Sequence, residues 1–247
     1  MKEFRKGRIH YLDTIRGITI ISMIIYHTVW DLSYIYDVRI LQNMGNWGYI
    51  WQQSICITFI LLSGFCFSLG KHKLKHSLIV FVSGSLITIV TAIFMRNNII
   101  IFGVLTFLGS AMLFSAFAEN ILLKLSPNVF LPICFALFLI TRDINKGYLG
   151  FYGIKILSLP RSLYVNNLSA FFGFPHLRFF STDYFSFLPW LFLFLTGYFI
   201  YRLAIQKAPL KRFGKNIPLI NFLGRHSLIV YLLHQPIIYF ITYLIFK

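Results

Sequence analysis

The sequence predicts an all-α fold: a polytopic membrane helix bundle of about seven transmembrane helices with a cytoplasmic N-terminus. Hydrophobic residues make up 57% of the 247 residues and charged residues only 12%, which is more apolar surface than one soluble core buries. Long apolar runs follow one another, and the formal charge of +16 gathers in short connections between them. No internal repeat or domain boundary is visible, so residues 1–247 are expected to form a single transmembrane domain.

Seven apolar runs approach the length of roughly 17 to 25 residues that a membrane-spanning helix needs. The fifth run is short and contains Pro132, which cannot donate a helical hydrogen bond. The helices are expected at residues 12–35, 47–70, 77–95, 99–118, 127–141, 184–205 and 219–246.

The connections between these runs alternate in charge, and this alternation predicts the topology. Those at 36–46 and 96–98 are short and nearly neutral, whereas three others are strongly basic and are therefore expected in the cytoplasm. An odd number of spans then places Lys247 and the long segment 142–183 outside. The basic segments are the N-terminal tail with Lys2, Arg5, Lys6 and Arg8, the sequence KHKLKH at 71–76, and the stretch 206–216 with Lys207, Lys211, Arg212 and Lys215.

The segment 142–183 is the one long connection expected outside the membrane. It is rich in Tyr, Phe and Gly and contains Pro160 and Pro175. Because long connections in compact proteins are usually functional or disordered, and aromatic residues argue against disorder, we expect an interfacial cap or re-entrant segment that touches substrate. An aromatic belt at the membrane interface is the alternative.

The first apolar run carries four ionisable side chains, Asp13, Arg16, His27 and Asp31. Such groups cost roughly 2.5 to 3.5 kcal/mol each at bilayer depth, so they persist where they face a bundle interior or a wet cavity. Four of them on one helix predict a functional site.

The spacing of these residues places them along one helical stripe. Arg16 and His27 are 11 positions apart, so they lie within about 20° of each other and roughly 16 Å apart along the helix axis. Asp31 follows His27 at i+4 and can fix the tautomer of its ring and raise its basicity. Asp13 and Arg16, at i and i+3, can form a pair. A capping and snorkelling pair at the interface is the alternative for these two residues.

The last apolar run contains a second polar stripe. His234 and Gln235 precede Pro236, and the i+4 and i+3 spacing of Ser227, Tyr231 and His234 places these three side chains on one face. A hydrogen bond between helices and a catalytic role explain this stripe equally well.

Arg225 and His226 lie at the cytoplasmic end of the same run. They are expected either to meet an anionic phosphate or to snorkel toward the headgroups.

Several chemistries are excluded because their motifs are absent. The sequence has no phosphate-binding GxxxxGK[ST] loop, no GxGxxG fingerprint, no HExxH helix and no GxSxG elbow. No ligand cluster predicts a metal. Nucleic-acid binding is not expected either, because no basic, aromatic-interleaved surface lies outside the spans.

Five sequence blocks carry a family resemblance. They are RIHYLDTIRGITIISMIIYHTVWDL, FILLSGFCFSLG, FGVLTFLGSAMLF, STDYFSFLPWLFLFLTGYFI and LGRHSLIVYLLHQP. Together they resemble the heparan-alpha-glucosaminide N-acetyltransferase catalytic domain family, a branch of the transmembrane acyltransferases, over about residues 8–240. The Arg16 to His27 spacing is also similar to that of the arginine and histidine pair on the first helix of the acyltransferase-3 group.

The resemblance implies a multi-pass enzyme of the cell membrane that moves an acyl group, typically acetyl, from cytoplasmic acetyl-CoA to a hydroxyl or amine of a glycan outside. The partners it implies are membrane lipid and a glycan or amino-sugar acceptor, while homo-oligomerisation stays open. Arg16, with Asp13 and Arg225, is then expected to hold the CoA phosphates.

In this hypothesis His27 is the general base and Asp31 orients it, while His234 and Gln235 donate hydrogen bonds to the developing oxyanion. The alternative is a proton-coupled transporter or flippase that uses the same buried groups as a proton relay. Seven unequal spans without an inverted repeat argue against that alternative.

Overall fold

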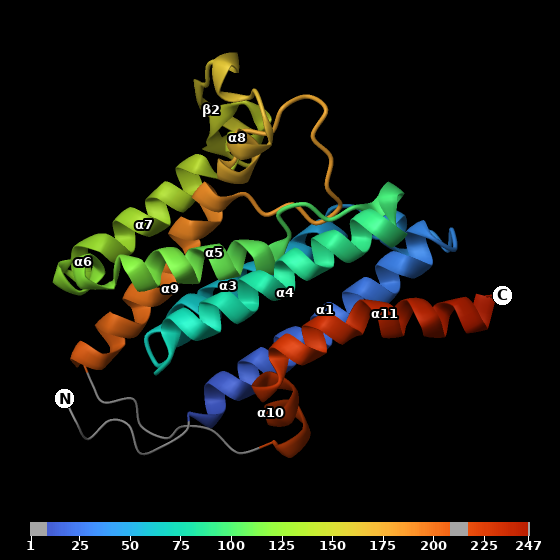
Figure 1. The fold of residues 1–247 in the computed structure, drawn as a ribbon, viewed down its shortest axis with the longest axis horizontal. Coiled ribbons are helices and arrows are strands. Elements are labelled where there is room, and N and C mark those ends of the chain that lie inside the picture. Colours follow the sequence, from blue (N-terminus) through green and yellow to red (C-terminus); the bar gives the residue numbers. More distant parts are fainter. Residues whose placement is uncertain (1–8, 208–216, 247) are drawn as a thin grey trace. The chain divides into compact units, whose positions relative to one another are not determined.

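The computed structural model describes residues 9–207 and 217–246, and Figure 1 shows that helices dominate these ranges. The one sheet within them is a two-stranded hairpin. The expected all-α fold class is confirmed.

The chain divides into two compact units. The first comprises residues 1–62 and 204–247, and the second comprises residues 63–203. Two helices cross this division: α3 (Asn46–Phe67) and α9 (Phe187–Lys207).

Most helices lie where the apolar runs predict them. The run 127–141 is helical over these same residues, as α7 (Pro127–Thr141), with Pro127 in its first turn, where a missing N–H costs nothing. Pro132 lies inside α7 without ending it. The other helices that match an expected run within a few residues are α1 (His10–Tyr34), α3, α4 (Lys73–Phe94) and α9.

Two expected helices differ from the observed ones. The run 219–246 is two helices, α10 (Pro218–Arg225) and α11 (Ser227–Phe246), separated at His226. The run 99–118 becomes helical only at α5 (Val104–Phe117), because Ile99 is extended and Phe102 has a positive φ of 56°. Short helices also lie in two expected connections, namely α2 (Ile40–Met44) and α6 (Glu119–Lys124).

Five described helices are long and apolar enough to cross a membrane, which identifies a membrane protein. α1 is outside this set because its polar residues lower its hydropathy, and α5 is outside it because it has only 14 residues. The basic residues of the N-terminal tail and most of those in the stretch 206–216 lie outside the described residues, as does Lys247. The five apolar segments are Asn46–Phe67, Lys73–Phe94, Pro127–Lys146, Phe187–Gln206 and Ser227–Phe246.

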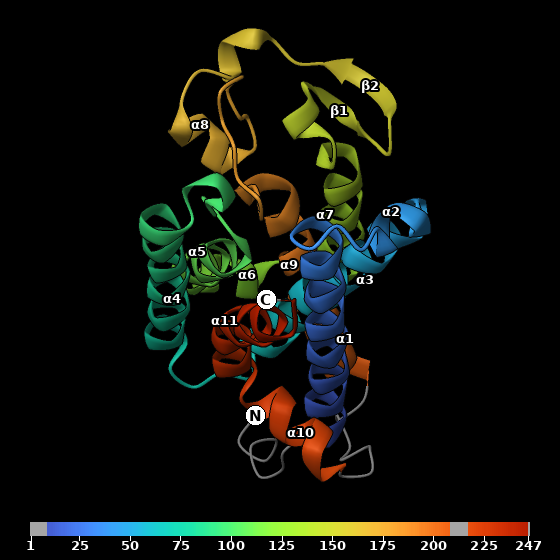
Figure 2. The same cartoon turned by 90° about the vertical axis from the view of Figure 1, so that its right-hand side faces the viewer.

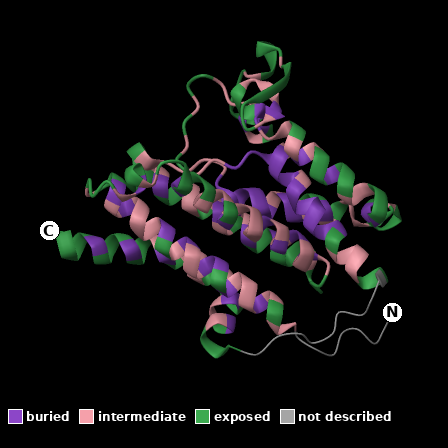
Figure 3. Ribbon diagram, turned by 180° about the vertical axis from the view of Figure 1, so that it is seen from behind, coloured by how far each residue is buried: buried purple, intermediate pink, exposed green. Residues whose placement is uncertain are grey.

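Within the second unit, α4 and α5 pack with their backbones in contact, and both views in Figures 1 and 2 show them side by side. Glycine permits this approach: a Cβ atom at Gly84 would collide with the amide of Thr106, and one at Gly109 would collide with the backbone of Phe81. Buried residues, purple in Figure 3, are most frequent along α5 and α9.

The segment between α7 and α9 is ordered and contains a β-hairpin. Its residues 181–185 pair with the connection between α4 and α5: the N–H of Thr182 donates to the carbonyl of Ile99 at 3.1 Å, and the N–H of Phe185 donates to that of Phe102 at 2.9 Å. The elements of this segment are η3 (Ile144–Lys146), β1 (Tyr148–Phe151), β2 (Ile154–Ser158), η4 (Arg161–Leu163) and α8 (Asn167–Phe172).

In the first unit, α10 packs against the N-terminal half of α1. The two backbones touch because Gly17 of α1 faces Ile220 and Gly224 of α10 faces Asp13. A Cβ atom at either glycine would collide with a backbone carbonyl oxygen, which explains why these two positions hold glycine.

Candidate functional site

The histidines predicted from the first and last spans meet within the first unit. His27 lies on α1 and His234 on α11, and their ring centroids are 4.8 Å apart with planes tilted by 59°. α1 is a single continuous helix, so Arg16 and His27 stand on one rigid element, as the spacing predicts. The structure therefore brings together two imidazoles that are 207 positions apart in the sequence.

A backbone contact fixes the hydrogen-bonding state of His234. Its Nδ1 atom lies 2.5 Å from the carbonyl oxygen of Tyr231, and because a carbonyl can only accept, Nδ1 carries the proton. The Nε2 atom of the neutral ring is then an acceptor. It is buried and has no hydrogen-bond partner among the described residues.

This geometry argues against the expected donation of a hydrogen bond from His234 to an oxyanion. A neutral ring that donates through Nδ1 has no second N–H to offer an oxyanion. His234 is instead a hydrogen-bond or proton acceptor.

Asp31 also differs from the expectation. It is fully buried, and its Oδ1 atom accepts a hydrogen bond of 2.8 Å from Nε2 of Gln235, so the expected pairing with His27 is wrong. The i+4 spacing places the carboxylate of Asp31 on the same face of α1 as His27. The hydrogen bond to this carboxylate nevertheless comes from the amide of Gln235 on α11. The Oδ2 atom of Asp31 and the Oε1 atom of Gln235 are buried and have no hydrogen-bond partner in the described ranges. These two oxygen atoms near the histidines can therefore still accept hydrogen bonds.

An aromatic wall that the sequence did not reveal flanks His27. The ring of Tyr26 meets His27 edge-on at 5.8 Å and Trp51 at 5.3 Å. Trp51 donates from Nε1 to the hydroxyl of Ser22 at 2.9 Å, which ties α3 to α1. Apolar patterning identifies Tyr26 and Trp51 only as core residues.

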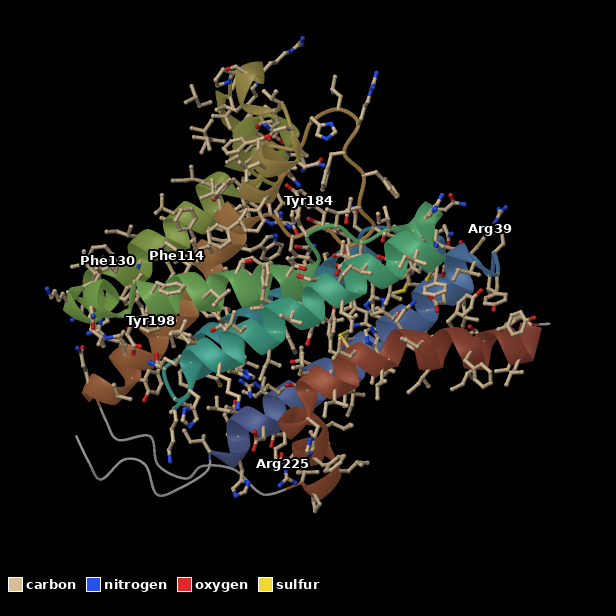
Figure 4. The ribbon with its side chains drawn as sticks, in the orientation of Figure 1. Arg39, Phe114, Phe130, Tyr184, Tyr198 and Arg225 are labelled. Atoms are coloured by element: carbon tan, nitrogen blue, oxygen red, sulfur yellow. The ribbon has the colours of Figure 1, made fainter. Side chains whose placement is uncertain are left out.

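The three residues expected to bind the donor belong to α1 and α10. Asp13 is buried, Arg16 is half-buried, and Arg225 is exposed, with its Nε atom donating to the carbonyl of Asn221 at 3.1 Å. Figure 4 shows Arg225 at α10, next to the N-terminal part of α1. A hydrogen bond of 2.6 Å from the hydroxyl of Thr14 on α1 to Oδ1 of Asn221 on α10 stabilises the packing of these two helices.

The ligand types that a metal prefers are not assembled here. Within residues 9–207 and 217–246, no group of three or more His, Cys, Asp or Glu side chains could hold a metal ion.

Comparison with known families gives one match that spans most of the chain. The family model described as "Heparan-alpha-glucosaminide N-acetyltransferase, catalytic" matches residues 8–236. Comparisons with curated proteins and with solved structures gave no match.

Proposed function

Because the chain belongs to the heparan-alpha-glucosaminide N-acetyltransferase catalytic family, we propose that it transfers acetyl from acetyl-CoA in the cytoplasm to a hydroxyl or amine of a glycan across the cell membrane. Membership of this family and the five apolar helices make it a membrane-bound acyltransferase. The observation that carries the proposal is the close pair of imidazoles on α1 and α11, one half-buried and one buried, together with the buried carboxylate of Asp31.

His27 acts as the general base in this proposal because the Nδ1 atom of His234 is already bonded to the carbonyl of Tyr231, and because His27 is half-buried whereas His234 is buried. It takes the proton from the acceptor hydroxyl or amine as that atom attacks the thioester carbonyl. When the tetrahedral intermediate collapses, the carbon–sulfur bond breaks and His27 returns the proton to the departing thiolate. A general base of this kind typically contributes about 10²- to 10⁴-fold in rate.

His234 takes over the supporting role that the sequence assigned to Asp31. Its Nε2 atom, fixed as an acceptor, stabilises the second N–H of the protonated His27 ring. The buried carboxylate of Asp31 adds electrostatic stabilisation, and Gln235 holds it in place. Among His27, Asp31, His234 and Gln235, the donor proposed for the oxyanion is the second N–H of the Gln235 amide, since the first is bonded to Asp31.

Arg16 is proposed to bind the CoA phosphates, with Asp13 and Arg225 beside it, at the end of the first unit where α1 meets α10. The pantetheine arm then follows α1 to His27, three helical turns and roughly 16 Å further along.

Replacing Arg16 by lysine is expected to raise KM for acetyl-CoA several-fold while the melting temperature in detergent stays near that of wild type. Lysine keeps the charge but loses the planar fork that binds phosphate oxygens in pairs. The control is Arg225→Lys, because Arg225 is exposed and its hydrogen bond is to its own helix, so its effect on KM is expected to be smaller. An unchanged KM in an active Arg16→Lys enzyme would remove Arg16 from the donor site.

A second assay distinguishes acyl transfer from proton-coupled transport. Purified protein in detergent should release free CoA from acetyl-CoA only when a glycan or amino-sugar acceptor is added. Solute movement across proteoliposomes without CoA would support the transporter instead.

The proposed topology places the connection between α3 and α4 in the cytoplasm and the hairpin segment outside. Cysteines introduced at Lys75 and Asn167, both exposed, should label from opposite sides of intact cells. Lys75 is preferred to Lys73, whose ammonium group forms an ion pair with Glu119 and contacts the ring of Phe67. Labelling of both positions from one side would overturn the topology.

A further inference from the structure

The β1–β2 hairpin is joined rigidly to the end of a membrane-spanning segment. The apolar segment Pro127–Lys146 ends two residues before β1 begins at Tyr148. The N–H of Asp143 donates to the carbonyl of Gly150 at 3.1 Å, and its carboxylate accepts the N–H of Gly153 in the hairpin turn at 2.9 Å. Figures 1 and 2 both show the hairpin at the end of α7. The position of the hairpin relative to the membrane surface is therefore set by α7.

The outer strand of this hairpin exposes large apolar side chains. All five residues of β2 are exposed, and Ile154, Ile156 and Leu157 are 71%, 64% and 58% exposed. The pairing of Leu149 with Leu157 and of Gly150 with Lys155 leaves Ile156 as an extra residue, a β-bulge. Figure 3 shows this strand in green, the colour of exposed residues. Large apolar side chains exposed together on one short strand indicate an interaction surface.

The turn of the hairpin carries a tyrosine where the backbone favours other residues. Tyr152 and Gly153 have positive φ angles of 51° and 87°, as in the two-residue turns that prefer Asn-Gly. A tyrosine in the left-handed region is strained, yet its side chain is 56% exposed and contacts the neighbouring Phe151 ring. Tyrosine is favoured where one end of a side chain is apolar and the other is wet, as at a membrane interface.

The charges around this patch fit a lipid surface. Lys155 lies within β2 and Arg161 follows it in η4, and both are exposed. Long basic side chains keep their charged ends among phosphate headgroups while apolar neighbours enter the acyl boundary.

We propose that the β1–β2 hairpin is a membrane anchor that inserts Tyr152, Ile154, Ile156 and Leu157 into the leaflet at which α7 ends, with Lys155 and Arg161 on anionic headgroups. The anchor holds the segment between α7 and α9 against the membrane surface. This proposal does not depend on acyl transfer, and its test measures no activity.

The test is the depth of a nitroxide label in proteoliposomes. Cys56, Cys66 and Cys134 are first replaced, and one cysteine is introduced by Ile156→Cys or by the control Ser162→Cys, an exposed position in η4. In vesicles of phosphatidylcholine with one quarter phosphatidylglycerol, the label at 156 should collide several-fold more with oxygen than with a water-soluble nickel chelate. The label at 162 should show the reverse.

Two outcomes would overturn the proposal. One is equal access of the nickel chelate to positions 156 and 162. The other is strong dipolar broadening between labels at 156, which would assign the exposed strand to pairing with a second copy of the chain.

A second variant separates insertion from folding. Tyr152→Asn relieves the strain of the turn, so thermal stability in detergent should stay equal or rise. The oxygen-to-nickel collision ratio at position 156 should nevertheless fall, because the interfacial ring is gone. An unchanged ratio in this variant would show that Tyr152 has no part in the anchor.

Discussion

Replacing His27 by alanine is expected to lower kcat for acyl transfer by about 10²- to 10⁴-fold or more, because the acceptor then loses its general base. Expression and melting temperature should stay close to those of wild type, since the ring is only half-buried and lies against His234 and Tyr26. The measurement is free CoA released per enzyme in detergent, with acceptor at saturation.

His226→Ala is the matched control for this variant. His226 lies between α10 and α11, is exposed, and has its ring against Phe222, so its loss should leave kcat near wild type. Asp31→Asn should lower kcat by less than His27→Ala, because the carboxylate only stabilises the protonated imidazole electrostatically and does not take the proton itself. Such a substitution keeps the size of the side chain and tests the charge alone.

His234→Ala decides which imidazole takes the proton. In the proposed mechanism it lowers kcat by less than His27→Ala, because His234 only stabilises the protonated ring. If His234→Ala eliminates turnover while His27→Ala loses less than roughly tenfold, the two roles are reversed. The tautomer of His234 leaves its Nε2 atom as the acceptor for the proton in that case.

Apolar run length was sufficient to predict most of the bundle. α7 has the predicted ends because Pro127 can begin a helix, and α1 stays continuous despite its polar residues. The break at His226 was missed because the run was judged by its overall length, although the sequence GRHS at 224–227 interrupts the apolar residues there. α10 ends where Gly224 meets α1, and this tertiary contact is invisible in a single sequence.

Helical periodicity predicted the part of the site that lies on a single helix. It placed His27 and Asp31 on one face of α1, but it could not choose the partner of Asp31. Gln235 lies 204 positions away, and only the packing of α11 on α1 brings its amide within hydrogen-bond distance. Trp51 was missed because a tryptophan in an apolar run resembles any core residue.

Gly224→Ala is expected to destabilise the first unit and to reduce activity with it. The added Cβ atom would collide with the backbone carbonyl of Asp13, which no rotamer change can move aside. Overpacking of this kind typically costs roughly 1 to 3 kcal/mol. Gly17→Ala should act similarly, because it meets the carbonyl of Ile220 from the other side of the same contact.

The measurement is the melting temperature in detergent, read together with KM for acetyl-CoA in whatever fraction remains active. Gly70→Ala serves as the control, since a Cβ atom there would make only an ordinary contact of 3.4 Å with the carbonyl of Phe67. Because α10 carries Arg225 and lies against the part of α1 that carries Asp13 and Arg16, surviving Gly224→Ala protein should bind acetyl-CoA more weakly. Wild-type stability in this variant would mean that α10 does not pack on α1, and the proposed donor site would lose its geometric basis.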